Sequence, residues 1–183
     1  TLMLDVDKRA VSASGLELDA RGDAAGFKAL AATLEIKKLL VAPSGRQLEL
    51  EALKLALAGR QGAHAFELAL DWPQLAANGQ QLKGSAVSGR YKLAGPAALA
   101  GSFRSSAPSG NFESLRLPGF AATLAGNAGT RKIDGQASAE LLLRLDRHAL
   151  ALEKLDLNAS VAEPGLQPLQ ISLRGGAAAD AKG

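Results

Sequence analysis

LELEALKLALAG, at residues 48–59, contains the spacing of leucines that decides the fold. The leucines at positions 48, 50, 53 and 55 form two alternating pairs, with one extra residue between the pairs at Glu51 and Ala52. Alternation of apolar and polar residues is typical of a β-strand with one buried face. A β-bulge inserts one extra residue into a strand and would keep both pairs of leucines on the same face. The segment therefore predicts a bulged strand.

The same spacing recurs along the chain. Three further copies have these apolar residues: Leu34, Ile36, Leu39 and Val41; Leu115, Leu117, Phe120 and Ala122; Leu150, Leu152, Leu155 and Leu157. A weaker copy consists of Leu82, Gly84, Val87 and Gly89. Copies that begin at 48, 82, 115 and 150 have a spacing of about 34 residues. A fixed period of roughly 20–50 residues indicates a repeat architecture.

Each repeat contains a turn signal and a second apolar segment. The turn signals are Gly59, Gly95, Gly126 and Pro164-Gly165. The second segments are 66–72, 99–103, 133–145 and 169–173. We therefore predict an all-β fold, a repetitive antiparallel β-meander that forms a curved sheet or groove, with about two strands in each 34-residue repeat.

A helical interpretation competes with this one, because Leu, Ala, Glu and Lys are good helix formers. Around Leu48 the helical period would put Leu48, Leu50 and Leu53 on different sides, so the pattern favours a strand. For residues 23–32 we expect a short helix as an alternative, because Phe27, Leu30 and Leu34 also match a helical face.

Residues 1–175 are expected to form a single repetitive domain, and the small, polar residues 176–183 a disordered tail. Pro73 and residues 107–110 are expected to end strands, because proline cannot donate to a β-ladder. The chain starts at Thr1 without a methionine, so we expect a fragment of a longer protein.

Composition and motifs argue against several classes of function. The net charge is +3, and Lys and Arg are scattered as single residues, so no nucleic-acid patch is predicted. The chain has no cysteine, which excludes disulfides and thiolate metal sites. The two histidines, His64 and His148, have no ligand or carboxylate at metal-site spacing. We predict no enzyme activity, no metal and no cofactor.

The apolar stripe is the candidate functional surface. Its candidate residues are Leu48, Leu50, Leu53, Leu55, Phe66, Leu68, Leu70, Leu115, Leu117, Phe120, Leu150, Leu152, Leu155 and Leu157. A single sheet has to cover such a face. Either the sheet curls on itself and makes these residues an ordinary core, or the face lines a groove that accepts an apolar ligand.

The segments LEIKKLLV, LELEALKLALAG, FELALDWPQLAANGQQLKG and LALEKLDLNASV resemble the AsmA-like family of bacterial envelope proteins over about residues 14–175. This resemblance implies a periplasmic protein that is anchored to the inner membrane by a segment outside this chain. It also implies a long apolar β-trough and a role in outer-membrane biogenesis and phospholipid transport. Gly84 and Gly89 depart from the leucine texture and interrupt the expected apolar face.

Two hypotheses follow. In the first, the chain is a non-enzymatic segment whose apolar groove handles phospholipid or another acyl lipid. In the second, it is a structural β-scaffold for envelope assembly that contacts proteins through its sheet edges and binds no lipid. Unpaired edges also predict self-association.

Overall fold

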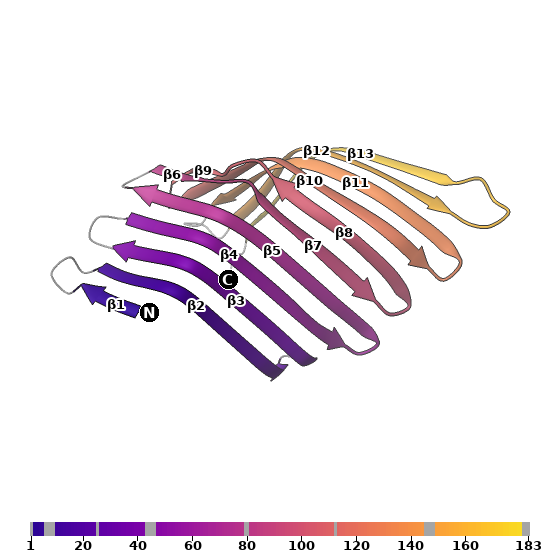
Figure 1. Cartoon of the computed structure of the whole chain (residues 1–183). Helices are drawn as coiled ribbons and strands as arrows, with labels where there is room; N and C mark the ends of the chain where they lie inside the picture. Colours follow the sequence, from indigo (N-terminus) through magenta and orange to yellow (C-terminus); the bar gives the residue numbers. More distant parts are fainter. Residues whose placement is uncertain are drawn as a thin grey trace.

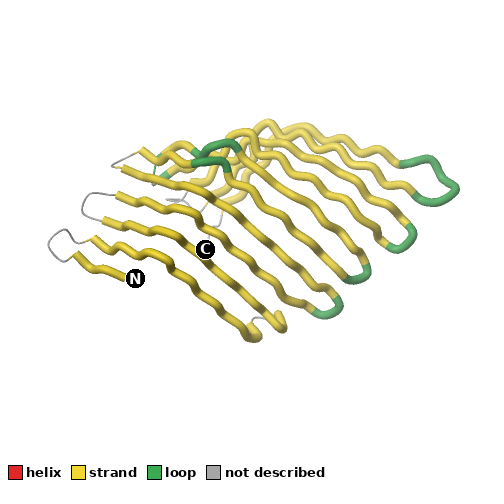
Figure 2. Tube along the Cα trace, in the orientation of Figure 1, coloured by secondary structure: helices red, strands yellow, loops and turns green. Residues whose placement is uncertain are grey.

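The computed structural model describes residues 2–5, 10–24, 26–42, 47–78, 81–111, 113–144 and 149–180. Within these ranges the chain forms a single 13-stranded sheet and contains no helix (Figure 1). Figure 2 shows long strands that lie side by side and bend along their length. Every strand pairing is antiparallel, so the predicted all-β meander is confirmed.

The strands follow the 34-residue period. They are β1 (Leu2–Asp5), β2 (Ala10–Ala24), β3 (Phe27–Ala42), β4 (Gln47–Gln61), β5 (His64–Asn78), β6 (Gln81–Gly84), β7 (Val87–Ala94), β8 (Ala97–Ser105), β9 (Ser109–Gly110), β10 (Ser114–Ala128), β11 (Arg131–Arg144), β12 (Ala149–Ala162) and β13 (Leu169–Asp180). The repeats correspond to β4–β5, β6–β9, β10–β11 and β12–β13. In the second repeat each long strand is interrupted, so β6 with β7, and β8 with β9, take the places of two single strands.

A line of backbone irregularities crosses the sheet, and we call it the crease. Its members are Gly15, Lys37, Ala52, Pro73, Ser85-Ala86, residues 106–108, Pro118-Gly119, Lys154 and Gly176. Hydrogen bonds maintain the ladder where strands are interrupted: the Ser85 amide donates to the Gln74 carbonyl at 2.8 Å, and the Ser106 amide donates to the Pro118 carbonyl at 2.9 Å. The crease divides each long strand into two segments.

The crease explains the leucine spacing. Ala52 has a φ of 51°, in the left-handed region, and lies between the paired residues Glu51 and Leu53. On the neighbouring strand the matching extra residue is Lys37, so the register on both sides of the crease is kept. The extra residue in each strand returns the side chains to the same face, as the pattern predicts. The expected β-bulge itself is wrong, because Lys37 and Pro73 oppose Ala52 one to one and the register does not shift there.

Two sequence-based expectations about secondary structure are wrong. Residues 27–32, expected as an alternative to form a helix, belong to β3, because they pair with both β2 and β4 and tertiary pairing overrides helix propensity. Pro73 does not end a strand, because it occupies the crease, where its missing N–H is tolerated, and β5 continues to Asn78.

The tail and two turns also differ from expectation. Residues 176–180, expected in the disordered tail, form the end of β13, because the β12 backbone supplies hydrogen-bond partners for these small residues. Residues 181–183 lie outside the described part of the chain. Gly59 and Gly126 lie within β4 and β10 instead of in turns, and the hairpins reverse three residues later, at Gly62 and Gly129, which have φ near 60°.

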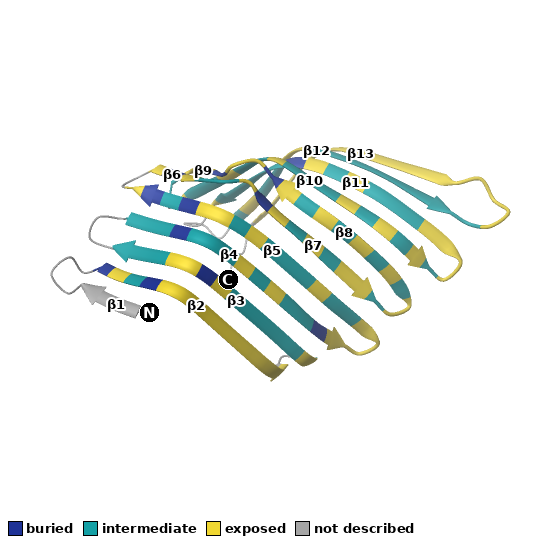
Figure 3. Cartoon of the chain, in the orientation of Figure 1, coloured by how far each residue is buried: buried dark blue, intermediate teal, exposed yellow. Residues whose placement is uncertain are grey.

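The buried core is small and lies at the crease, with Ile36 on one side and the other four residues on the other side. Ile36, Leu50, Leu75, Ala77 and Leu82 form one buried cluster. Figure 3 shows most of the buried positions near one end of β2–β6, with a few more elsewhere, whereas most of the sheet is half-buried or exposed. None of the large side chains in the described segments is fully buried.

The exposed area of the chain also indicates an open sheet. The solvent-accessible surface is 12032 Å². A compact monomer of the same mass, 18.7 kDa, would expose about 8300 Å². The difference arises because a single layer of strands leaves both of its faces without a second layer.

Candidate functional site

The register brings all the candidate apolar residues to one face of the sheet, the apolar face. One row of directly paired residues crosses it from β2 to β13: Leu18, Leu34, Leu55, Leu70, Gly89, Phe103, Ala122, Ala137, Leu157 and Leu173. A second row lies beyond the crease: Val11, Val41, Leu48, Ala77, Leu82, Gly110, Leu115, Leu143, Leu150 and Ala179. Residues paired directly across strands lie on the same face.

The burial of these residues depends on how close they lie to the buried cluster. Leu50 belongs to the buried cluster, and Leu48, Leu53 and Leu115 pack against it. In the described residues the remaining candidates are half-buried, except for Leu150, which is exposed. The alternatives of a closed core and a solvated apolar surface therefore apply to different parts of the same face.

Trp72 lies where these two parts meet. It packs against the buried cluster, and it is directly opposite Leu53 on β4. Its indole nitrogen Nε1 is buried and has no hydrogen-bond partner in the described part of the protein. As the single tryptophan of the chain, it is a natural fluorescent reporter of this face.

Aromatic side chains fill the glycine positions of the second repeat. The Phe103 ring covers Gly89, and the Tyr91 ring covers Gly101. The Tyr91 hydroxyl donates a hydrogen bond to the backbone carbonyl of Thr123 at 2.9 Å. An aromatic ring on the neighbouring strand commonly compensates for a glycine in a sheet. The apolar face therefore continues across Gly89, where the sequence predicted an interruption.

The apolar face is most exposed toward the two edges of the sheet. On β2, Leu18 is 57% exposed, and on β13 Leu169 and Leu173 are 61% and 53% exposed. β1 covers only residues 10–13 of β2, and no described strand pairs with the outer side of β13. Unpaired backbone and exposed apolar side chains therefore occur together at both edges.

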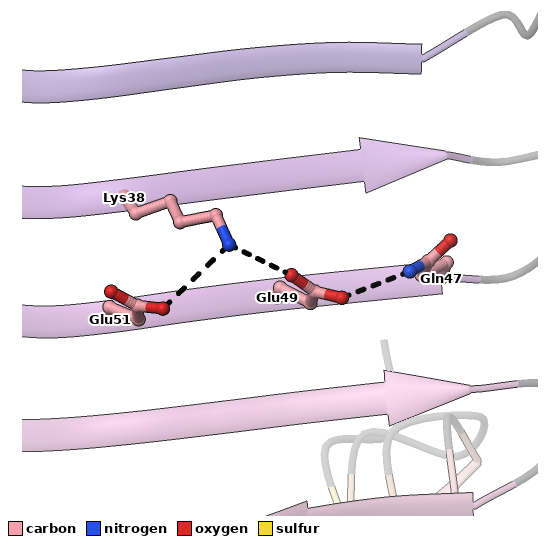
Figure 4. A network of polar contacts seen from close by, with 4 residues as sticks. All are labelled: Lys38, Gln47, Glu49 and Glu51. Carbon is pink, nitrogen blue, oxygen red and sulfur yellow. Dashed lines mark hydrogen bonds and ion pairs between the residues drawn. The ribbon is translucent and has the colours of Figure 1, made fainter.

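The opposite face is polar and contains cross-strand ion pairs. Figure 4 shows the Lys38 ammonium on β3 between Glu49, at 3.2 Å, and Glu51, at 3.7 Å, on β4. The hydrogen bond from Lys38, followed by one from Gln47 and the charge of Lys38, lowers the pKa of the Glu49 carboxyl. The hydrogen bond to Glu49, with the charges of both carboxylates, raises the pKa of Lys38.

A hollow of about 1150 Å³ lies on this polar face. Two adjacent rows of paired side chains line it between β3 and β12. One row contains Thr33, Ala56, Ala69, Arg90, Ser102, Thr123, Gln136 and Asn158, and the other contains Glu35, Lys54, Asp71, Ser88, Arg104, Ala121, Ser138 and Asp156. The hollow is therefore a trough that runs across the strands, and we call it the polar trough.

The trough lies apart from most of the candidate apolar residues. Of the candidate apolar residues, only Leu55 and Leu70 touch it, and they lie between its two rows of polar side chains. The sheet is concave on its polar face along this line, so the apolar row behind it is not the lining of a groove there. Alternating patterns identify the two faces of a sheet, but they carry no information about the direction in which it curves.

Other candidate features add no chemistry in the described residues. His64 is exposed at the start of β5, and His148 lies outside the described residues. No group of three His, Cys, Asp or Glu side chains that could hold a metal ion occurs in the segments that the structure describes. The same segments include no helix long and apolar enough to cross a membrane. No family model, curated protein or solved structure matches the chain.

Proposed function

We propose that the chain is a non-enzymatic segment of a bacterial envelope protein, and that its apolar sheet face handles phospholipid or another acyl lipid. The observation that carries this proposal is the uninterrupted apolar face, which stays half-solvated away from the crease. The resemblance to AsmA-like proteins adds a periplasmic location, an inner-membrane anchor outside this chain and a role in outer-membrane biogenesis.

The energetics favour an apolar occupant. Soluble monomers rarely leave a contiguous apolar patch larger than a few hundred Å² uncovered. Each acyl methylene removed from water contributes about 0.8 kcal/mol, so partial coverage of a chain of ordinary length gives useful affinity. Acyl chains are flexible and need no polar partner, which suits a face of Leu, Ala and Phe.

Charged substitutions on this face test the proposal. A lysine at Leu53 or Leu68 should abolish lipid association, whereas an acidic residue at Lys54, on the polar face, should not. Because Leu53 packs against the buried cluster, a more tolerant pair is also needed. Leu93→Lys changes an apolar-face residue that is 43% exposed, and Ala98→Lys adds the same charge to the polar face of the next strand.

The measurement is mass spectrometry of lipids extracted from the purified, folded protein, with Trp72 fluorescence during titration with phospholipid vesicles. We expect Leu93→Lys to reduce bound lipid and the fluorescence change, and Ala98→Lys to resemble the wild type. Absence of lipid from the wild type, together with no photo-crosslink from Leu55 or Leu68 to lipid in cells, would reject lipid handling.

A structural scaffold is the second candidate, and the exposed edges of β2 and β13 favour it. A strand from another protein could add to either edge through main-chain hydrogen bonds. Under this proposal, the charge at Leu93 has no effect on complex formation, whereas changes along β13 do.

A further inference from the structure

Two arginines lie in the middle of the polar trough without an acidic partner. Arg90 on β7 and Arg104 on β8 both line the trough. Arg90 is paired with Ser102, and Arg104 with Ser88, so the two arginines are diagonal neighbours on adjacent strands. No carboxylate in the described residues lies within ion-pair distance of either guanidinium group.

Most other basic side chains on the polar face have a carboxylate nearby. Lys38, Lys92 and Arg174 on the same face each contact a carboxylate on a neighbouring strand, and Arg116 contacts Glu153 two strands away. Lys54, in the trough itself, lies directly between Glu35 and Asp71. In contrast, the cross-strand neighbours of Arg90 and Arg104 are Ala69, Ala121 and two serines. Asp71, a diagonal neighbour of Arg90 on β5, also lines the trough, but in the described residues it makes no ion pair with either arginine. The two adjacent arginines are therefore the positive part of the trough.

Three hydroxyl side chains lie next to the two arginines. The Ser102 and Thr123 hydroxyls are 3.0 Å apart and share one hydrogen bond, which leaves one of their two protons free to donate. Ser88 also lines the trough, opposite Arg104. Two guanidinium groups and hydroxyl donors, arranged around small alanines, match the tetrahedral oxygens of a phosphate group.

We propose that Arg90 and Arg104, with Ser88, Ser102 and Thr123, form a binding site for a phosphate group in the polar trough. This site goes beyond lipid handling by the apolar face, because the sheet backbone separates it from any acyl chain bound there. The phosphate group can belong to a molecule in solution or to a headgroup displayed by a membrane.

The first arm of the test titrates the folded 183-residue chain with inorganic phosphate and follows amide signals by NMR. We expect saturable shifts at Ser88, Ser102 and Thr123, with affinity about tenfold weaker in each of Arg90→Gln and Arg104→Gln, because each removes a charge-assisted hydrogen bond. The shifts should also weaken as ionic strength rises. Both substitutions are at exposed positions, and circular dichroism checks that each variant folds.

Arg116→Gln is the matched control, since Arg116 is an exposed arginine on the same face that contacts Glu153 at 3.5 Å. It should bind phosphate as the wild type does. An equal loss of binding in Arg116→Gln would overturn the proposal, because it would show a general effect of net charge.

The second arm measures binding to phosphatidylcholine vesicles with and without phosphatidic acid, which supplies a phosphate monoester at the membrane surface. Arginine-dependent binding of inorganic phosphate identifies a soluble source. Arginine-dependent binding only to vesicles with phosphatidic acid identifies a headgroup. Failure of both, or binding that is unchanged in Arg90→Gln and Arg104→Gln, overturns the proposal. Lipid handling is distinguishable, because it responds to Leu93→Lys and not to these arginines.

Discussion

The Phe103 side chain on β8 lies directly over Gly89, its paired residue on β7, and occupies the space that a side chain at position 89 would need. The same ring stacks on Phe120 of β10, with ring centroids 6.3 Å apart and an angle of 27° between the planes. Phe103 therefore links β7 to β10 across the apolar face. Glycine at position 89 is the condition for this contact.

Gly89→Ala is expected to destabilise the protein by about 1–3 kcal/mol, because the added methyl group would overlap the Phe103 ring and the backbone carbonyl of Ala69. Urea denaturation followed by circular dichroism measures the change. Gly135→Ala is the control: Gly135 is also on the apolar face, but a methyl group there would meet Ala159 at an ordinary contact distance of 3.6 Å. It should cost less than about 0.5 kcal/mol. Equal losses in the two variants would contradict the account of Gly89.

Ala52→Gly should stabilise the protein by about 1 kcal/mol, since Ala52 has a φ of 51° and a left-handed backbone costs a non-glycine residue about this much. Ala56→Gly, in the regular part of the same strand, should instead destabilise it by about 0.5–1 kcal/mol. Thermal unfolding of the two variants compares them. The same sign of change in both would show that the left-handed backbone at position 52 stores no strain.

The sequence predicts the repeat and the two faces because both depend on local pattern. Alternation around Leu48 identifies the faces, and the extra residue at Ala52 identifies the position of the crease in β4. The crease as a whole is not predictable in this way, because Lys37 and Pro73 carry no bulge signal of their own and take their positions from neighbouring strands. Gly59 resembled a turn signal, although its function is to make room for Phe66 and Leu30.

For the candidate sites, too, local spacing predicts which face a residue lies on, but not its burial or its neighbours on other strands. The shared face of Leu53 and Leu68 follows from spacing, whereas their burial depends on how the sheet curves beyond the crease. The proposed phosphate site requires that Arg90 and Arg104, which are separated by a turn in the sequence, become diagonal neighbours in the sheet. Scattered single charges in a sequence give no sign of such a pair. Register, which pairing across the whole sheet determines, brings them together.

The ion-pair network of Figure 4 predicts a dependence of stability on pH. The folded pKa of Glu49 lies below its ordinary value of 4.5, so its stabilising contribution is present above pH 4.5 and is lost as the pH falls through the folded pKa. The pKa of Lys38 is raised above 10.5, so its contribution is present below that pH and is lost as the pH rises through the folded pKa. Urea midpoints measured across pH should therefore fall at both extremes.

Glu49→Gln should flatten the acidic part of this profile, because it removes the carboxyl that Lys38 and Gln47 stabilise in its charged form. The Glu140 carboxyl, whose pKa the hydrogen bond from Lys154 also lowers, leaves part of the acid dependence in place. Gln47→Ala removes the second hydrogen bond to Glu49 and should also flatten the acidic part, by a smaller amount. An acidic profile of Glu49→Gln that is identical to that of the wild type would contradict the assignment.

The outer edge of β13 should make the chain associate as its concentration rises. This edge lacks a described partner strand, includes no proline between Leu169 and Asp180, and lies beside exposed apolar side chains such as Ile171, which is 45% exposed. Proteins commonly protect such an edge with charged residues, because its free backbone groups can pair with another strand. Adding lysines at Gln170 and Ala178 should therefore reduce association, because two facing edges would repel each other.

Sedimentation equilibrium measures the effect, and lysines at Ala98 and Ala100, in the central strand β8, supply the same added charge as a control. If the wild type stays monomeric at millimolar concentration, the edge is not a contact surface. If both double variants lose association equally, net charge and not edge pairing is the cause.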